Sequence, residues 1–268
     1  ASTTNQFFSN LLRIDGEPFP CLEAVSIASQ EQQLVYGPAV VGGVQVTRKV
    51  FAPADGRVVR YLELLTNNGD AAQAITVTVE GYLASAGQTR LLVDPAQSGG
   101  LYAVTDGDLE GESGRSVLAQ VFAGAGASTP PAVTFTSGSG EFAYRWVALT
   151  LQPGQTAGLL HFVTQAAPGD LAGATAHAEV LSRLEDVASL VQIGAEERAW
   201  VVNFVMTPET TPVIAPEAPN ESDAPQRIFL PVIMGVEANL QTAPSASSEA
   251  PSAPEAGEQR VYLPVVER

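Results

Sequence analysis

The chain has 268 residues, with 29 Asp and Glu against 13 Lys and Arg and a net charge of −16. Lys49 is the sole lysine and no basic stripe occurs, which argues against nucleic acid or an anionic membrane as partner, because both require cations to replace their counterions. No apolar run approaches the ~18 residues needed to span a bilayer.

The composition changes after about Met206, where Pro, Ala, Ser and Glu become dominant. The sequence therefore predicts one folded body over residues 1–206 and an extended tail over 207–268. The single cysteine, Cys21, excludes an intramolecular disulfide. The chain begins Ala1-Ser2-Thr3-Thr4 without Met, so we expect a protein that is extracellular or at the cell surface after removal of a signal peptide.

Strand patterns fill the middle of the chain. Residues 75–83 alternate apolar and polar side chains, and Asn67-Asn68-Gly69-Asp70 before them predicts a hairpin turn from the preceding strand. Pro153-Gly154 predicts another such turn. The expected strands are Val44–Phe51, Val58–Leu65, Ile75–Leu83, Leu101–Thr105, Val117–Phe122, Ala132–Thr136, Phe142–Leu151 and Thr156–Thr164. The fold class is mainly β, an antiparallel β-sandwich.

Helical periodicity begins at Asp170, a plausible N-cap after Pro168-Gly169, and apolar residues then recur every three or four positions to about residue 190. We expect this helix, over 170–190, to pack one face on the sandwich. A second short helix is expected over Ala195–Phe204.

Four segments together resemble a known module. V-T-R-K-V-F-A-P (46–53), R-Y-L-E-L-L-T-N (60–67), L-Q-P-G-Q-T (151–156) and A-E-E-R-A-W-V-V-N-F (195–204) are similar to a β-sandwich module of large secreted bacterial proteins, over about residues 35–205. The closing V-Y-L-P-V-V (261–266) resembles the C-terminal tails of exported proteins of filamentous thermophilic bacteria. These resemblances imply export and a β-sandwich, and neither supplies a catalytic motif.

Candidate catalytic groups are few. The two histidines, His161 and His177, have no second ligand at metal spacing, which argues against a zinc site, and His161 is expected to be a packed, hydrogen-bonded ring. No G-x-S-x-G occurs, and Lys49 does not complete S-x-x-K. The many acids single out no catalytic carboxylate pair. We therefore expect no enzyme.

An acidic stretch alternates with glycine at Asp106, Asp108, Glu110 and Glu112. Alternating carboxylates on a flexible loop favour Ca²⁺, the one cofactor the sequence suggests. An EF-hand would require Glu at the twelfth position, where Val117 stands, so the alternative is a solvated acidic loop.

Phe142, Tyr144 and Trp146 lie on the opposite alternation from Val147 and Leu149. If the aliphatic side is the core, an aromatic ladder faces outward and could bind sugars or protein. A strand buried on both faces, or a bulge that exchanges the faces midway, is the alternative.

The tail carries one apolar phrase twice, at residues 227–234 and 260–266, an offset of 33 residues, and we call the copies the first and second phrase. Both consist of strand-forming residues around a central proline, which favours an edge strand with one free side. Their docking residues are Ile228, Phe229, Leu230, Pro231, Val232, Ile233 and Val261, Tyr262, Leu263, Pro264, Val265, Val266. Asn220-Glu221-Ser222 matches a glycosylation signal at Asn220.

These patterns predict a structural subunit of an extracellular filament or surface assembly, a homopolymer in which tail strands pass to neighbouring copies. One alternative is a cell-surface carbohydrate-binding or adhesive module that binds glycans through the aromatic ladder. Another is an accessory domain of a secreted hydrolase.

Overall fold

The computed structural model describes residues 10–20, 32–82, 89–106, 116–136 and 140–206, and the backbone of 26–28. The contacts divide the chain into two units, Ala1–Met234 and Gly235–Arg268, and the described residues all belong to the first.

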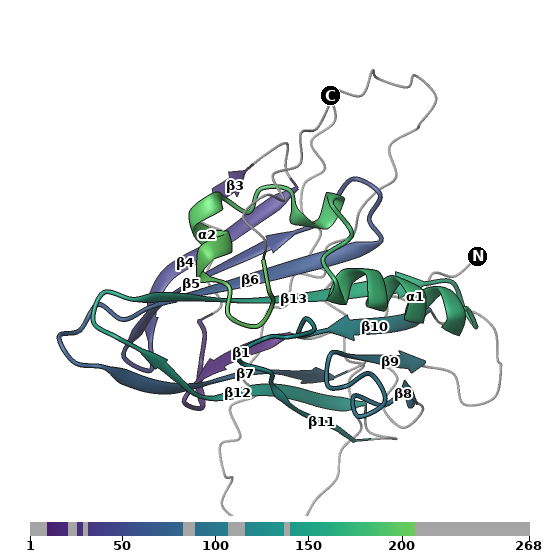
Figure 1. Cartoon of the computed structure of the whole chain (residues 1–268), viewed down its shortest axis with the longest axis horizontal. Coiled ribbons are helices and arrows are strands. Elements are labelled where there is room, and N and C mark those ends of the chain that lie inside the picture. Colours follow the sequence, from purple (N-terminus) through teal and green to yellow (C-terminus); the bar gives the residue numbers. More distant parts are fainter. Residues whose placement is uncertain are drawn as a thin grey trace, which may run out of the picture. The chain divides into compact units, whose positions relative to one another are not determined.

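Two antiparallel sheets form the body (Figure 1), which confirms the predicted β-sandwich. One sheet has the order β11 (Ala132–Thr136), β12 (Glu141–Leu151), β7 (Gln73–Tyr82), β1 (Leu11–Ile14) and β2 (Glu17–Pro18). The other has the order β3 (Ser26–Ala28), β4 (Gln33–Val41), β5 (Val44–Phe51), β6 (Val58–Thr66), β13 (Thr156–Ala166), β10 (Val117–Val121), β9 (Tyr102–Asp106) and β8 (Arg90–Val93).

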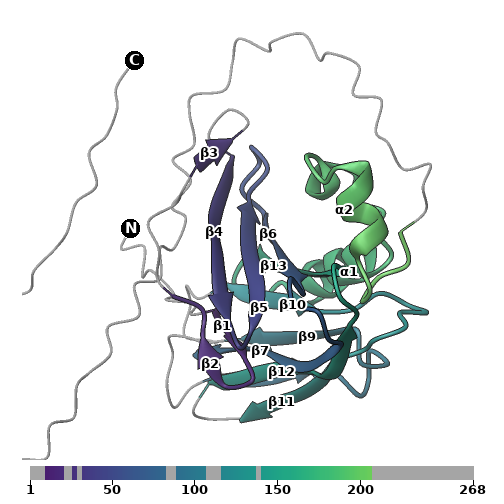
Figure 2. The ribbon, with the colours of Figure 1, turned by 90° about the vertical axis from the view of Figure 1, so that its left-hand side faces the viewer.

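Two apolar cores make three layers. The first core lies between the sheets, where residues such as Val77 of β7 and Trp146 of β12 meet Leu65 of β6 and Leu159 of β13. The second lies on the other face of the eight-stranded sheet, under the helices (Figure 2). Strand β6 contributes to both cores, which explains why it is buried along most of its length instead of alternating.

Helix α1 (Leu171–Ser182) begins where predicted, because the Asp170 side chain accepts a hydrogen bond from Gly173 N at 2.8 Å. It ends at Ser182, short of the predicted residue 190, because Leu184 adopts a left-handed φ of 56°. The apolar periodicity continues because the 3-10 turn η1 (Ala188–Leu190) packs Leu190 on the same core. In the described part of the chain, no helix has the length and apolarity to cross a membrane.

The predicted hairpins at 67–70 and 153–154 are wrong, because each connection carries the chain from one sheet to the other. Strands β6 and β13 pair in one sheet, and β7 and β12 pair in the other. Asn67 fastens the two crossings together: its amide Nδ2 donates to Leu151 O at 3.0 Å, its backbone N donates to Gln155 O, and its carbonyl accepts from Gly154 N. A local turn signal does not distinguish such crossings from hairpins.

Helix α2 (Ala195–Trp200) is shorter than the predicted 195–204, because the next residues join the sheet. Val201 forms a parallel bridge with Gly158 of β13, and Val202 N donates to Gly158 O at 3.0 Å. The chain therefore leaves the helix as a short strand beside the first half of β13, where β10 has already ended.

Candidate functional site

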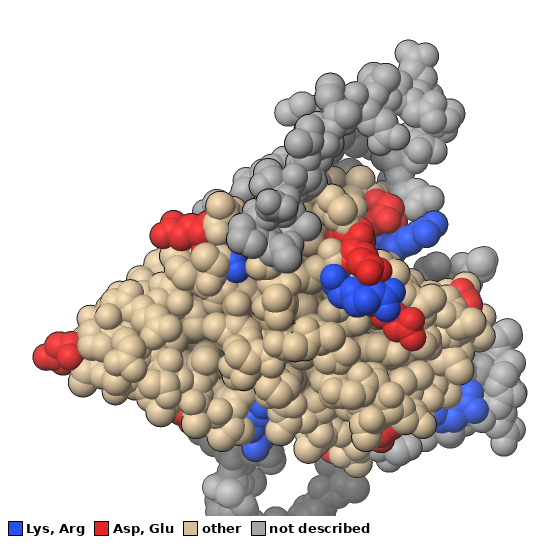
Figure 3. Space-filling view, in the orientation of Figure 1, with Lys and Arg blue, Asp and Glu red and all other residues tan. Residues whose placement is uncertain are grey.

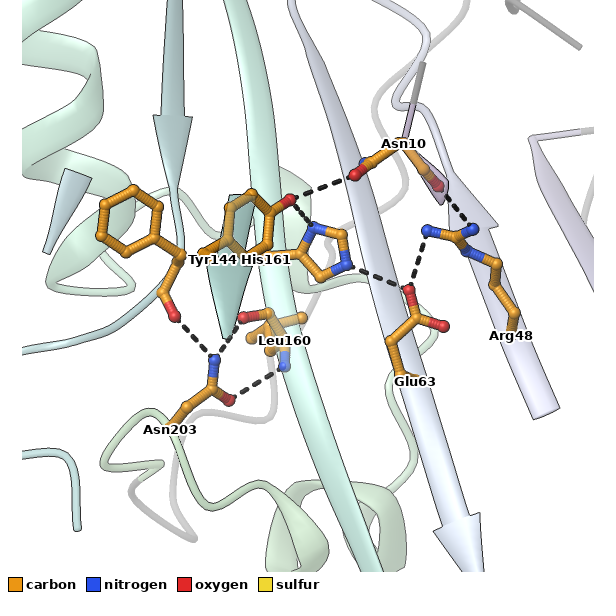
Figure 4. A network of polar contacts seen from close by, with 8 residues as sticks. Asn10, Arg48, Glu63, Tyr144, Leu160, His161 and Asn203 are labelled. Atoms are coloured by element: carbon orange, nitrogen blue, oxygen red, sulfur yellow. Dashed lines mark hydrogen bonds and ion pairs between the residues drawn. The ribbon is translucent and has the colours of Figure 1, made fainter. Parts of the chain in front are cut away.

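A chain of polar side chains crosses the inner core and centres on His161 of β13 (Figure 4). His161 Nε2 lies 3.0 Å from Glu63 Oε1, and Nδ1 lies 2.8 Å from the Tyr144 hydroxyl. Arg48 completes the chain, with Nη2 3.0 Å from Glu63 Oε1 and Nη1 donating to Asn10 O at 2.8 Å. Each side chain comes from a different strand or strand end, so the network depends on the register of the whole sandwich.

The strand register explains the assembly. His161 lies directly opposite Tyr61, and the two rings stack at 4.8 Å with an interplanar angle of 6°. Arg48 lies opposite Glu63, with its guanidinium 5.0 Å from the centre of the Tyr61 ring. Because Tyr144 belongs to the five-stranded sheet and His161, Glu63 and Arg48 belong to the eight-stranded sheet, the network links the two layers.

Burial determines the protonation of the network. Loss of water lowers the pKa of His161, and the hydrogen bond from Glu63 opposes this only in part, so the ring is neutral near pH 7. Burial also raises the pKa of the Tyr144 hydroxyl well above its usual value. A neutral His161 that donates from Nε2 to the Glu63 carboxylate accepts a hydrogen bond at Nδ1 from the Tyr144 hydroxyl.

A tyrosine, histidine and carboxylate in this order could relay a proton in an enzyme. Here His161 and Glu63 are 0% exposed and Tyr144 is 1% exposed, so the reacting atoms are covered by protein. The expectation that His161 is a packed, hydrogen-bonded ring is confirmed. The arrangement connects the two sheets through the core between them.

Sequence reasoning missed Arg48, Glu63 and Asn203, although all three fall within the motifs that carry the family resemblance. A usable signal existed, because a charged residue inside an apolar strand run, such as Glu63 in R-Y-L-E-L-L-T-N, requires a buried partner. The identity of that partner depends on strand order, which the sequence does not give.

The prediction of an aromatic ladder that faces outward is wrong. Phe142, Tyr144 and Trp146 are 5%, 1% and 0% exposed and lie in the core between the sheets. The register of β12 against β7 shifts between Trp146 and Leu149, and the two intervening residues are exposed. This bulge exchanges the faces of the strand, as the alternative interpretation stated, so Leu149 points to the same core as the rings.

Most of the other predicted sites lie outside the described residues: Asp108, Glu110, Glu112, Asn220, Cys21 and both tail phrases. Asp106 is described, at the end of β9, where it is 7% exposed and its Oδ2 lies 3.1 Å from Arg90 Nη2. Within the described ranges, no group of three His, Cys, Asp or Glu side chains could hold a metal ion. The calcium prediction remains a prediction.

Charged side chains are sparse on the face that Figure 3 shows. Where they gather in this view, both signs occur together. Near the end of α1, Arg183 forms ion pairs with Glu179 and Glu185. The described residues of this face carry no basic patch of the kind that binds nucleic acid.

The sheet edges differ in how far they are protected. In the described structure the edges are β2 and β11 in one sheet and β3 and β8 in the other. Strand β2 has two residues including Pro18, β3 has three residues, and β8 carries Arg90 and an irregular register. In natural proteins such features protect an edge strand, because they leave few free backbone groups with which another strand could pair. Strand β11 has five residues, Ala-Val-Thr-Phe-Thr, with no charge, proline or register shift.

Hydrogen bonds fix which way the backbone of β11 points. The Thr136 carbonyl accepts from Gly140 N at 3.2 Å, and Thr134 Oγ1 donates to the Ala143 carbonyl at 3.4 Å, which places both contacts at the seam with β12. Because backbone groups alternate along a strand, Val133 and Phe135 direct their N–H and C=O groups away from β12. Their side chains are half-buried against the inner core.

Comparisons with known proteins identify no family. No family model matches the chain, and no curated protein matches it. Among solved structures, a polysaccharide lyase is similar at 15% identity and a TM-score of 0.36, over 61% of this chain and 26% of the lyase chain. A putative aldose 1-epimerase from Escherichia coli K12 is similar at 11% identity and a TM-score of 0.32, over 53% of this chain and 67% of that chain. This chain therefore spans about a quarter of the length of the lyase that it matches.

Proposed function

We propose that the protein is a structural subunit of an extracellular filament or surface assembly, in which subunits join by donating tail strands to the sheet edges of neighbouring copies. The observation that carries the proposal is β11, an unprotected edge strand in a body whose other described edges are short, charged or irregular. A strand of this kind pairs with any suitable chain, so a protein that keeps one has a use for it.

The tail supplies strands of matching character. Each phrase has apolar residues on both alternations, and a soluble spacer has no need of such residues. Burying a large aliphatic or aromatic side chain contributes ~1.5–3 kcal/mol before ordering costs, and each phrase offers several. Backbone pairing with an edge adds hydrogen bonds that do not depend on side-chain identity.

The reach of the tail permits exchange between molecules. A body of about 200 residues has a diameter of roughly 45 Å. The linker 207–226 between the body and the first phrase has about 20 residues, which span ~62 Å when extended at ~3.1 Å per residue. A phrase can therefore reach the edge of an adjacent copy.

The two alternative functions receive no support from the described residues. A glycan-binding or adhesive role was expected to use the aromatic ladder, and those rings lie in the core. The role of accessory domain to a hydrolase has no described feature that favours it. The proposal assigns the chain no catalytic activity.

The test uses the full chain and changes the tail only. In the double variant Leu230→Asp/Leu263→Asp, each phrase would have to bring a charge into an apolar contact, so assemblies should be lost in sedimentation velocity and negative-stain electron microscopy. Leu240→Asp makes the same chemical change outside both phrases and should leave the assemblies intact. If the wild-type protein is monomeric at all concentrations, or if the double variant assembles normally, the proposal is wrong.

A further inference from the structure

We infer that the acceptor is the outer edge of β11, at Val133 and Phe135, and that its occupant is a tail phrase of a second copy of this chain bound antiparallel. This inference rests on the proposed function and makes it specific, because it names the acceptor, the register and the residues that face it.

The edge offers two residues whose backbone groups point outward. Val133 and Phe135 each present one N–H and one C=O on the side away from β12, and among the described residues no strand pairs with them there. Their half-buried side chains form the rim of the inner core. An added strand would satisfy the backbone groups and cover this rim in the same step.

Proline determines which side of each phrase can face the edge. Pro231 has no N–H, so its position must direct the backbone outward, away from the acceptor. Because backbone groups alternate along a strand, Ile228, Leu230 and Val232 then direct their N–H and C=O groups to β11. The same argument for Pro264 turns Val261, Leu263 and Val265 to the acceptor. In both phrases the proline therefore turns the equivalent alternate residues to the acceptor, although the two sequences differ.

The same alternation along the strand determines where the side chains of a docked phrase point. Residues paired directly across an antiparallel ladder point to the same face, so residues opposite Val133 and Phe135 point to the core. Leu230 or Leu263 would therefore pack beside these two side chains and extend the inner core by one strand. The central leucine is the residue that the two phrases share at this position.

Charge favours the antiparallel direction. Ala132 lies opposite Arg145 and Thr136 lies opposite Glu141, so the β12 strand behind the edge is basic at one end and acidic at the other. An antiparallel second phrase brings Arg260 to the acidic end and Glu267 to the basic end, whereas a parallel one brings like charges together. Exposed pairs of this kind select orientation more than they add affinity. Every strand pair of the five-stranded sheet, to which β11 belongs, is antiparallel, which agrees with this direction.

A docked phrase also prevents a further strand from joining the sheet at this edge. Its outer side lacks an N–H at the proline, so a third strand cannot pair fully with it. One edge therefore accepts one phrase, and the contact does not propagate sideways into an aggregate.

The test blocks the edge without touching the tail. In the full chain, Val133→Pro removes an outward N–H that β12 does not use, while Val133→Thr keeps it and preserves the branched shape. Val133→Pro should lose assembly in sedimentation velocity, and Val133→Thr should keep it. Val133→Pro mixed with Leu230→Asp/Leu263→Asp should form complexes of two or three molecules, because one partner retains the phrases and the other retains the edge.

Hydrogen exchange gives a second readout on the wild-type protein, which decides the matter if Val133→Pro does not fold. The amides of Val133 and Phe135 should exchange on the order of 100-fold more slowly in assemblies than in the Leu230→Asp/Leu263→Asp monomer, the factor expected at a phrase concentration ~100 times its Kd. The Thr134 amide, which faces β12, should be equally slow in both.

The outcomes separate the two proposals. If Val133→Pro assembles like wild type while the phrase variant does not, or if the Val133 and Phe135 amides are equally exposed in both states, the β11 assignment is wrong and the assembly function stands. If the phrase variant assembles normally, the proposed function itself is wrong. If the wild type is a monomer with slow Val133 and Phe135 amides, the phrase docks on its own body, and donation to a second copy is wrong.

Discussion

Replacement of Asn203 tests how the C-terminal segment is held to the sheet. Strand β10 ends at Val121 opposite Phe162, which leaves the first half of β13 without that neighbour. The Asn203 side chain takes its place: Oδ1 accepts from Leu160 N at 2.9 Å, and Nδ2 donates to Leu160 O at 2.6 Å (Figure 4). Nδ2 also donates to Phe122 O at 2.9 Å.

The cost of Asn203→Ala can be worked from these three contacts. The side chain is 0% exposed, so the alanine variant leaves one backbone donor and two acceptors buried without their partner. At about 1–1.5 kcal/mol for each lost bond, the free energy of unfolding should fall by about 3–5 kcal/mol. For a body of about 200 residues this corresponds to a Tm lower by roughly 6–20 °C.

Urea denaturation of the full chain, followed by tryptophan fluorescence, measures the change. Asn68→Ala is the matched control, because the Asn68 amide makes one exposed hydrogen bond to Gln45 and should cost less than about 0.5 kcal/mol. Asn203→Asp should destabilise at least as much as alanine, since a carboxylate oxygen would face two carbonyl oxygens. If Asn203→Ala lies within 1 kcal/mol of wild type, the backbone-mimicking role is refuted.

Two further predictions concern the inner core. The pKa of His161 is lowered in the folded state, so below about pH 6.5 the unfolded chain takes up a proton that the native ring does not, and unfolding free energy should fall by up to ~1.4 kcal/mol per pH unit. His161→Gln should reduce this slope in urea titrations at pH 7 and pH 5, and an equal slope in both proteins would contradict the assignment. Trp146→Ala should cost about 3–5 kcal/mol in the same assay, and a variant of unchanged stability would show that the ring is not in the core.

The sequence identified most of the strands because alternation is a local signal. Segments such as Val44–Phe51 and Ala132–Thr136 have the predicted bounds. Two hairpin signals were overlooked: Asp15-Gly16, between β1 and β2, and Gly42-Gly43, between β4 and β5. All four of these residues have positive φ, as tight hairpin turns require.

The errors have a common physical origin, because each depends on contacts between distant segments. The turn at Asn67 looks the same for a hairpin and for a crossing, and only its bonds to Leu151 and Gln155 show which one forms. The bulge after Trp146 has no glycine to mark it, and Ala148 adopts a φ of 56° there. A shift of one residue moves a whole half-strand to the other face, which is why the aromatic ladder was placed outside.

One open edge among the described strands and two phrases in each chain limit the form of the proposed assembly. If every molecule gives one phrase and receives one at β11, two copies that exchange phrases form a closed dimer, and copies that donate to a third molecule form an open head-to-tail chain. The second phrase then has no edge of its own, because each acceptor holds one strand. The second phrase can replace the first when the first dissociates, because equivalent alternate residues of both phrases face the acceptor. Tethered replacement of this kind raises the effective concentration of donor strand at each junction, so that the junction stays occupied although a single five-residue edge offers few hydrogen bonds.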